Sequence, residues 1–194
     1  GLANRTIYDR VGGGPTLSEP TTASPDARTG VLTGEVGSEE ATQPWAPPTP
    51  GPGEVQAVLC PHGHANAPTA VVCRACGVPI VDSTVSIVTR PILARLVFED
   101  GPVIDVDRTQ IIGRGPTSPT GLVEAPNLIA VPNPDGDLSR EHTAVRIEGW
   151  DLVIEDLGST NGTEVRLPGR EPQRLHDHDP ILVVPGTKVT LAGV

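Results

Sequence analysis

Aromatic residues, methionine and lysine are scarce in this chain of 194 residues. It contains two Trp, one Tyr, one Phe and no Met, and Lys188 is its one lysine. A hydrophobic core must therefore consist mainly of Val, Ile and Leu. No apolar run approaches the ~20 residues of a membrane-spanning helix, and no signal-peptide pattern opens the chain. We expect a cytoplasmic protein and, since the first residue is Gly1, a piece of a longer natural chain.

Positively charged residues are also few compared with negatively charged ones. The chain has 14 Lys and Arg against 24 Asp and Glu, a formal net charge of −10, and no cluster of basic residues. Such a surface repels the phosphates of nucleic acids, so we expect no nucleic-acid partner. Ser-His-Asp, HExxH and P-loop patterns are absent from the sequence as well. We therefore expect neither an enzyme nor a small-molecule substrate.

The three cysteines cannot all pair with one another in disulfides, which favours a metal or free thiols in a reducing compartment. Cys73 and Cys76 stand in a Cys-x2-Cys-Gly arrangement, whose spacing lets two thiolates grip one ion. Cys60 supplies a third sulfur, and either His64 or His62 completes a tetrahedral set. We predict a closed, structural Zn²⁺ site that supplies folding energy to a segment with almost no core of its own.

Composition divides the chain into four parts. Residues 1–54 are rich in Pro, Gly and Thr without apolar periodicity, so we expect a disordered tail. Residues 55–82 form the zinc-ribbon-like segment, 83–91 a linker and 92–194 a β domain. Thr22 and Thr42 in the tail lie beside acidic residues or Pro and are candidate phosphorylation sites. The alternative is that both are ordinary solvated threonines.

Short strands with Gly, Pro, Asp or Asn between them recur through the second half, and no helical period competes with them. This spacing is typical of an all-β antiparallel sandwich. The strands are expected at Ile92–Phe98, Val103–Val106, Thr109–Ile112, Leu128–Val131, Thr143–Ile147, Leu152–Ile154, Gly162–Leu167, Gln173–Leu175, Ile181–Val183 and Thr187–Leu191. A further brief strand is expected at Val55–Leu59.

Three separated motifs follow one another inside this region. They read Gly113-Arg114, Ser139-Arg140-Glu141-His142 and Leu157-Gly158-Ser159-Thr160-Asn161-Gly162. In this order they resemble the forkhead-associated (FHA) domain, a β-sandwich that binds phosphothreonine peptides. The resemblance covers roughly residues 92–194. It also favours His64 over His62, because Cys60-x3-His64 is similar to part of the small Cys3His ribbons found beside FHA domains in high-GC bacteria.

The resemblance implies a role for each motif residue. Arg114 and Ser139 match the residues that contact phosphate, and Thr160 and Asn161 match the turn that contacts phosphate and the peptide backbone. Arg140 falls where the family varies, and either adds positive charge or points to solvent. Three glycines and one histidine are expected to support the loops: Gly113, Gly158, Gly162 and His142. Arginine suits a phosphate because its planar fork donates two parallel hydrogen bonds.

Two departures from the family pattern matter. A long Pro-rich loop occupies residues 115–137 and is expected to widen, cover or re-aim the pocket. The chain also ends on residues 187–194, which resemble the penultimate strand of the family, so the last strand is expected to be missing or to lie outside this sequence.

The function predicted on this basis is an adaptor in Ser/Thr kinase signalling. Its ligand is a phosphothreonine-containing protein or the chain's own phosphorylated N-terminal tail. The alternative is an FHA-like scaffold that binds its partner without phosphate.

Overall fold

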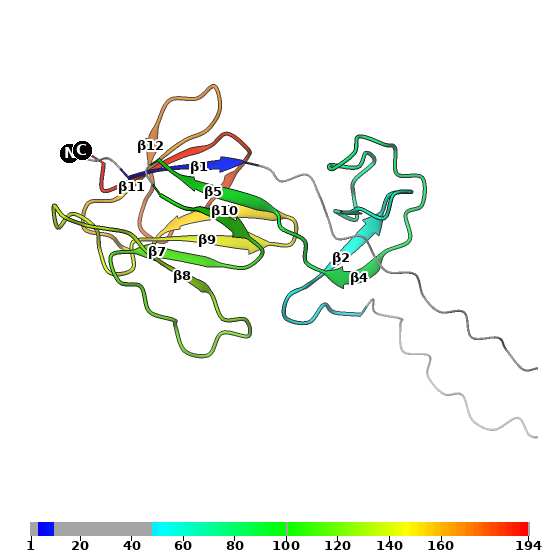
Figure 1. Ribbon diagram of the computed structural model, residues 1–194, viewed down its shortest axis with the longest axis horizontal. Coiled ribbons are helices and arrows are strands. Elements are labelled where there is room, and N and C mark those ends of the chain that lie inside the picture. The colour runs from blue at the N-terminus through cyan, green and yellow to red at the C-terminus, as the bar shows by residue number, and fades with distance from the viewer. Residues whose placement is uncertain (1–3, 10–47, 100, 194) are drawn as a thin grey trace, which may run out of the picture.

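The computed structural model describes residues 4–9, 48–99 and 101–193. Figure 1 shows two bodies: a β-sandwich and a smaller unit that carries the cysteines. We call the smaller unit, residues 54–89, the Cys3His module. Across the described residues, no helix has the length and apolarity required to span a membrane.

The first sheet of the sandwich contains six strands in the order β12-β11-β14-β1-β5-β6, all antiparallel. In chain order they are β1 (Asn4–Asp9), β5 (Ala94–Phe98), β6 (Val103–Val106), β11 (Thr163–Arg166), β12 (Gln173–Arg174) and β14 (Lys188–Leu191). Buried and exposed positions alternate along β5 and β11, so one face of this sheet packs inward.

The second sheet has five strands in the order β13-β10-β9-β7-β8. They are β7 (Gln110–Gly113), β8 (Asn127–Ala130), β9 (Thr143–Glu148), β10 (Asp151–Asp156) and β13 (Ile181–Val183). β9 and β10 form a hairpin through a turn at Gly149 and Trp150, with six registered residue pairs. β7 and β8 are parallel, which differs from the predicted antiparallel pattern, because the intervening loop carries the chain back to the start of β7.

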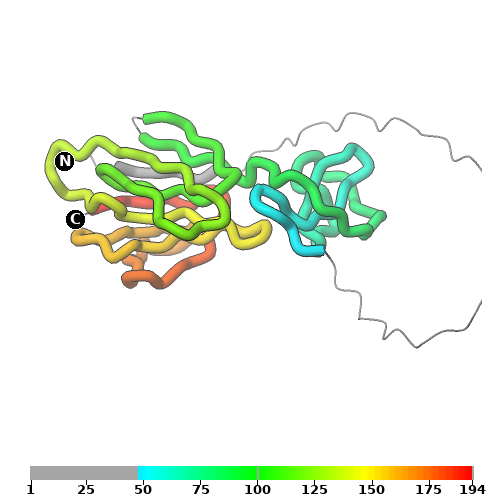
Figure 2. The backbone as a smooth tube through the Cα atoms, turned by 90° about the horizontal axis from the view of Figure 1, so that it is seen from below, coloured from blue at the N-terminus to red at the C-terminus, as the bar shows by residue number. Residues whose placement is uncertain are grey.

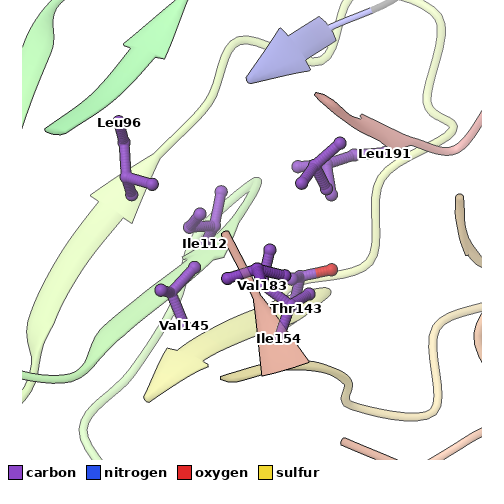
Figure 3. A pocket seen from close by; sticks show the side chains of 8 residues that line it. Leu96, Ile112, Thr143, Val145, Ile154, Val183 and Leu191 are labelled. Atoms are coloured by element: carbon purple, nitrogen blue, oxygen red, sulfur yellow. The ribbon is translucent and has the colours of Figure 1, made fainter. Parts of the chain in front are cut away.

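Aliphatic side chains from both sheets fill the space between them, as the scarcity of aromatics predicted. Leu96, Ile112, Val145 and Ile154 are among the most buried. Figure 3 shows them around a small apolar cavity of about 10 Å³. This volume is no larger than one water-sized probe, and small-molecule pockets need ~300 Å³ or more. The cavity is therefore a packing defect of the core rather than a ligand site.

The Cys3His module contains a three-stranded sheet in the order β3-β2-β4. Its strands are β2 (Glu54–Leu59), β3 (Ala65–Asn66) and β4 (Ser86–Thr89). The expected strand at Val55–Leu59 is therefore present. β4 falls in residues 83–91, which were expected to be a linker, and it pairs with β2 along four registered positions. The end of that segment is therefore part of the module.

The N-terminal residues hold the main departure from the sequence-based expectation. Asn4–Asp9 lie in the segment predicted to be a disordered tail, yet they form β1 between β14 and β5. The last strand of the family was expected to be missing or to lie outside this sequence, and the position beside β14 is occupied by β1 from the other end of the chain. Residues 10–47 of the predicted tail lie outside the described residues.

The Cys3His module contacts the sandwich through the β9–β10 turn (Figures 1 and 2). The indole Nε1 of Trp150 donates a hydrogen bond to the Gln56 carbonyl at 2.7 Å. The Arg74 guanidinium lies 5.1 Å from the Trp150 ring and donates to the Ile92 carbonyl at 2.9 Å. Arg90 forms an ion pair with Glu124 at 2.9 Å. These polar contacts fix the module at one end of the sandwich.

Candidate functional site

The three sequence motifs meet at the opposite end of the sandwich, which we call the rim. β7 ends there at Gly113, β9 begins there after His142, and β10 ends there at Asp156. The amide N–H of Arg114 donates to the Ser139 carbonyl at 3.0 Å, and that of His142 donates to the Ile112 carbonyl at 2.9 Å. The first two motifs therefore lie side by side, as predicted.

Gly113 is required by this close approach. A Cβ at this position would lie 2.0 Å from the Arg140 carbonyl oxygen and 2.9 Å from that of Ser139. Both are backbone atoms that cannot swing aside, so any side chain here would push the two motifs apart. Glycine at position 113 is therefore what lets the first two motifs lie this close.

Asp156, a residue that the sequence analysis missed, holds the third motif in place. Its carboxylate accepts hydrogen bonds from the Ser159 N–H (2.7 Å), the Ser159 hydroxyl (2.8 Å) and the Thr163 hydroxyl (2.6 Å). Burial is the largest single influence on the Asp156 pKa and raises it, but these hydrogen bonds together outweigh burial and lower the pKa. The available signal was an Asp at a strand end, three residues before Ser159.

His142 joins the second motif to the third. Its side chain is fully buried, Nε2 lies 3.0 Å from the Gly162 carbonyl oxygen, and Nδ1 accepts from the Ser139 N–H at 3.3 Å. With Nδ1 accepting, Nε2 carries the proton and donates. His142 is thus buried between the two motifs and hydrogen-bonded to both.

Two polar side chains at the rim retain capacity for a ligand. The Ser139 hydroxyl oxygen accepts from the Thr160 N–H at 3.1 Å, which leaves its own proton available to a bound acceptor. The Asn161 amide donates one N–H to the Asp137 carbonyl at 2.9 Å. Its second N–H and its carbonyl have no partner in the described part of the chain, and this pair can hold a peptide backbone.

Three arginines give the rim its positive charge. Arg114 and Arg140 are exposed, and neither pairs with a carboxylate among the residues the structure describes. Arg174 of β12 is the third, and the sequence analysis did not identify it. A Cβ on Gly162 would lie 2.5 Å from its Nε, so the guanidinium covers this glycine, next to Asn161. Only the pairing of β12 with β11 brings it there.

The long loop after Arg114 does not stay at the rim. The Thr117 hydroxyl and amide both donate to the Glu141 carboxylate, which fixes the start of the loop beside the second motif. The chain then runs to the other end of the sandwich, where Glu124 pairs with Arg90 at 2.9 Å. The start of the loop therefore borders the second motif at the rim.

The family model for the FHA domain matches residues 111–184, the part of the chain that contains all three motifs. The β-sandwich of this chain is of the FHA type. FHA domains are phosphopeptide-binding modules that recognise phosphothreonine peptides of partner proteins. No curated protein matches the chain.

Solved FHA structures resemble about half of the chain. An FHA domain from a structural and functional analysis of phosphothreonine-dependent FHA interactions is 24% identical, covering 48% of this chain and 85% of that chain with a TM-score of 0.26. The FhaA FHA domain complexed with the intracellular domain of Rv3910 is 26% identical (47% and 89%, TM-score 0.27). The FHA domain of CT664 from Chlamydia trachomatis is 24% identical (50% and 89%, TM-score 0.25).

The cysteine cluster forms a second candidate site, in the Cys3His module. Ligand atoms of Cys60, His64, Cys73 and Cys76 all lie within 4.8 Å of one another. The Cys60 sulfur is 3.5 Å from His64 Nδ1 and 3.9 Å from the Cys76 sulfur, and the Cys73 sulfur is 3.7 Å from His64 Nδ1. Tetrahedral zinc with bonds of about 2.0–2.3 Å requires ligand separations of roughly 3.5–3.8 Å. The cluster therefore fits a metal ion.

The ionisation of the thiols supports the same interpretation. Burial is the largest influence on the Cys73 thiol and raises its pKa, but hydrogen bonds from the Cys76 and Ala75 amides and neighbouring side chains lower it to about 6. For Cys76, the Val78 amide lowers the pKa, whereas burial and the nearby thiols outweigh it and raise the pKa. A bound cation would remove this competition between adjacent negative charges.

The two histidines near Cys60 are now distinguished. His64 is in the cluster, whereas His62 is exposed and its ring centre lies 6.3 Å from that of His64. The preference for His64 is therefore supported. Thr22 and Thr42, the predicted phosphorylation sites, lie outside the described residues.

Proposed function

We propose that this chain is a phosphothreonine-peptide binding adaptor that acts in Ser/Thr kinase signalling in the cytoplasm. The observation that carries the proposal is the convergence at the rim of the loops that hold Arg114, Ser139 and Asn161. Among the described residues, the Ser139 hydroxyl proton and the second N–H and the carbonyl of Asn161 have no hydrogen-bond partner. A phosphothreonine offers about two negative charges and three acceptor oxygens at pH 7. The rim provides donors of the matching kind, on loops held by buried hydrogen bonds.

Each rim residue has a distinct role in this proposal. Arg114 and Ser139 contact the phosphate, Thr160 contacts it from the facing turn, and Asn161 holds the peptide backbone. Arg140 and Arg174 add local positive charge to a chain whose formal net charge is −10. Because exposed charges are screened by salt, we expect affinity to fall as ionic strength rises.

The ligand is either a partner protein or the phosphorylated tail of this chain. Thr22 and Thr42 are the tail positions we propose for kinase modification, and their phosphates would then be ligands of the rim.

We also propose that the Cys3His cluster binds one Zn²⁺ through Cys60, His64, Cys73 and Cys76. Four protein ligands complete a tetrahedron and leave no position for a substrate, so the ion is structural. The module has few buried apolar residues, and metal binding would supply the free energy for its folding.

Binding of fluorescent peptides tests the adaptor function. Each peptide carries threonine, phosphothreonine or phosphoserine at one position in a randomised background, and polarisation reports binding. We expect binding of the phosphothreonine peptides alone. Arg114→Ala and Ser139→Ala should each weaken it by roughly ten- to a hundredfold, since a hydrogen bond to a charged group contributes ~1.5–3 kcal/mol.

Arg170→Ala is the matched control. Arg170 is also an exposed arginine, but it follows the end of β11 that points away from the rim. This variant should bind like the wild type. Equal binding of modified and unmodified peptides would instead favour the phosphate-independent scaffold, and no binding of phosphothreonine peptides would contradict the adaptor.

A further inference from the structure

β1 fills an interior position of the six-stranded sheet although it comes from the far N-terminal end of the chain. It pairs with β14 from Asn4↔Leu191 to Ile7↔Lys188, and with β5 from Thr6↔Phe98 to Asp9↔Arg95. Figure 1 shows it, in blue, beside β5 at the upper part of the sandwich. We call the position between β14 and β5 the strand slot.

The sheet depends on an occupant of this slot. β14 and β5 do not pair with each other, so removing β1 would split the sheet into β12-β11-β14 and β5-β6. Both facing strands carry core residues, among them Val189, Leu191, Leu96 and Phe98. Two unpaired edges beside an open core would strongly favour the entry of an extended segment.

The connection between β1 and the rest of the chain does not determine which copy supplies that segment. A hairpin loop of ~2–5 residues forces a strand to pair with its own neighbour. β1 is instead followed by residues 10–47 before the described chain resumes. These 38 residues can span about 130 Å when extended, several times the length of a strand.

We propose that β1 is an exchangeable strand, and that the strand slot also accepts residues 4–9 of a second copy of this chain. Each copy would donate β1 and receive the partner's, so the dimer is closed and no slot remains empty. The register with β14 and β5 is the same whether the segment comes from its own chain or from the partner. The rim lies on other loops and stays accessible, so this inference is independent of phosphopeptide binding.

Protein concentration decides between the two arrangements. An intramolecular strand competes with an effective concentration that is millimolar for short linkers and falls as the linker lengthens. We therefore expect monomers at low concentration and exchanged dimers at high concentration. Exchange requires β1 to leave both ladders and should be slow unless the chain is refolded.

An engineered disulfide shows which copy fills the slot. Arg5 and Thr190 are registered partners, and Thr190 is only half-buried, so replacing both with Cys spares the core. The full-length zinc-loaded R5C/T190C chain is refolded at roughly 1 µM and at roughly 1 mM, concentrations on either side of the expected effective concentration, and then oxidised. We expect an intramolecular disulfide at the lower concentration and covalent dimers at the higher one.

Two controls keep the result unambiguous. Single variant T190C reports any dimer formed through the native cysteines and should stay monomeric on non-reducing gels. The pair Ile7→Cys and Val97→Cys repeats the test on the β5 side, in case the first pair prevents folding. Covalent monomers alone at both concentrations would overturn strand exchange. Absence of any disulfide in both folded pairs would overturn the strand slot itself.

Discussion

The sandwich and the Cys3His module are held together by different interactions. Among the residues whose burial the structure describes, the sandwich encloses one cluster of 17 buried apolar residues contributed by both sheets. In the module, the buried residues of this kind are Val55, Ala57, Val58 and two of the cysteines. One chain thus contains a domain with a large apolar core beside a unit with a small one, and in that unit a cluster of potential metal ligands lies where further apolar side chains would be needed.

Removal of the metal should affect the two regions most differently, because it should unfold the Cys3His module and leave the sandwich folded. We expect zinc analysis of the purified chain to give about one ion per chain, and Cys73→Ser to abolish it. Apparent binding free energies of structural zinc reach ~10–16 kcal/mol, which exceeds what the small core of the module can supply. Hydrogen exchange should then show loss of protection in β2 and β4 while β9 and β10 stay protected. A metal-free chain with a protected module would contradict this view.

A cavity in the core should destabilise the sandwich and leave the Cys3His module unchanged. Ile154 is 1% exposed and lies between the sheets, so Ile154→Ala should lower the free energy of unfolding of the sandwich by about 2–5 kcal/mol. Urea unfolding measures the change, and zinc content should stay at the wild-type value. Val184→Ala, which truncates an exposed side chain, is the control and should change stability little. Equal losses in both variants would show that burial does not stabilise the sandwich.

Asp156→Asn should have a smaller effect that depends on pH. The carboxylate accepts three hydrogen bonds, and its replacement should cost about 1–3 kcal/mol at neutral pH. Because folding lowers the Asp156 pKa below the ordinary 3.8, its contribution is complete above that pH and disappears as pH falls through the folded pKa. The stability difference from wild type should therefore be constant near neutrality and shrink below about pH 4. A difference that persists unchanged in acid would contradict this assignment.

The smallest expected effect concerns the contact between the two regions. Trp150→Phe keeps an aromatic ring beside Arg74 but removes the hydrogen bond to the Gln56 carbonyl. We expect a loss of about 1 kcal/mol or less in urea unfolding, with unchanged zinc content. A loss of zinc in this variant would show that the module depends on the sandwich for its fold.

Local sequence patterns predicted most of the fold. Short apolar segments separated by Gly, Pro, Asp or Asn identified the ten strands of the second half. β1 was missed because Asn4–Asp9 lie in a Pro- and Gly-rich region without apolar periodicity, and their pairing depends entirely on strands far away in the chain. β4 was missed for a similar reason, since four residues next to Pro91 resemble a linker until they pair with β2.

The residues of the candidate site also fall into those that the sequence predicted and those that it did not. Consecutive motifs identified Arg114, Ser139 and Asn161, and the structure brings their loops together. Arg174 was not predictable, because only the register of β12 with β11 carries it to Gly162. Asp156 differs from Arg174, because its partners Ser159 and Thr163 are close in sequence and an Asp three residues before a Ser was an available signal. Residues positioned by long-range pairing leave no periodic signal in the sequence.

The β9–β10 hairpin sets the distance between the rim and the Cys3His module. It runs from His142 and Asp156 at the rim to Trp150 at the Cys3His module. Six residues of strand measure about 20 Å, and this length keeps the two ends apart. A peptide held at one end therefore does not compete for space with anything that touches the other, and the hairpin works as a rigid spacer of defined length.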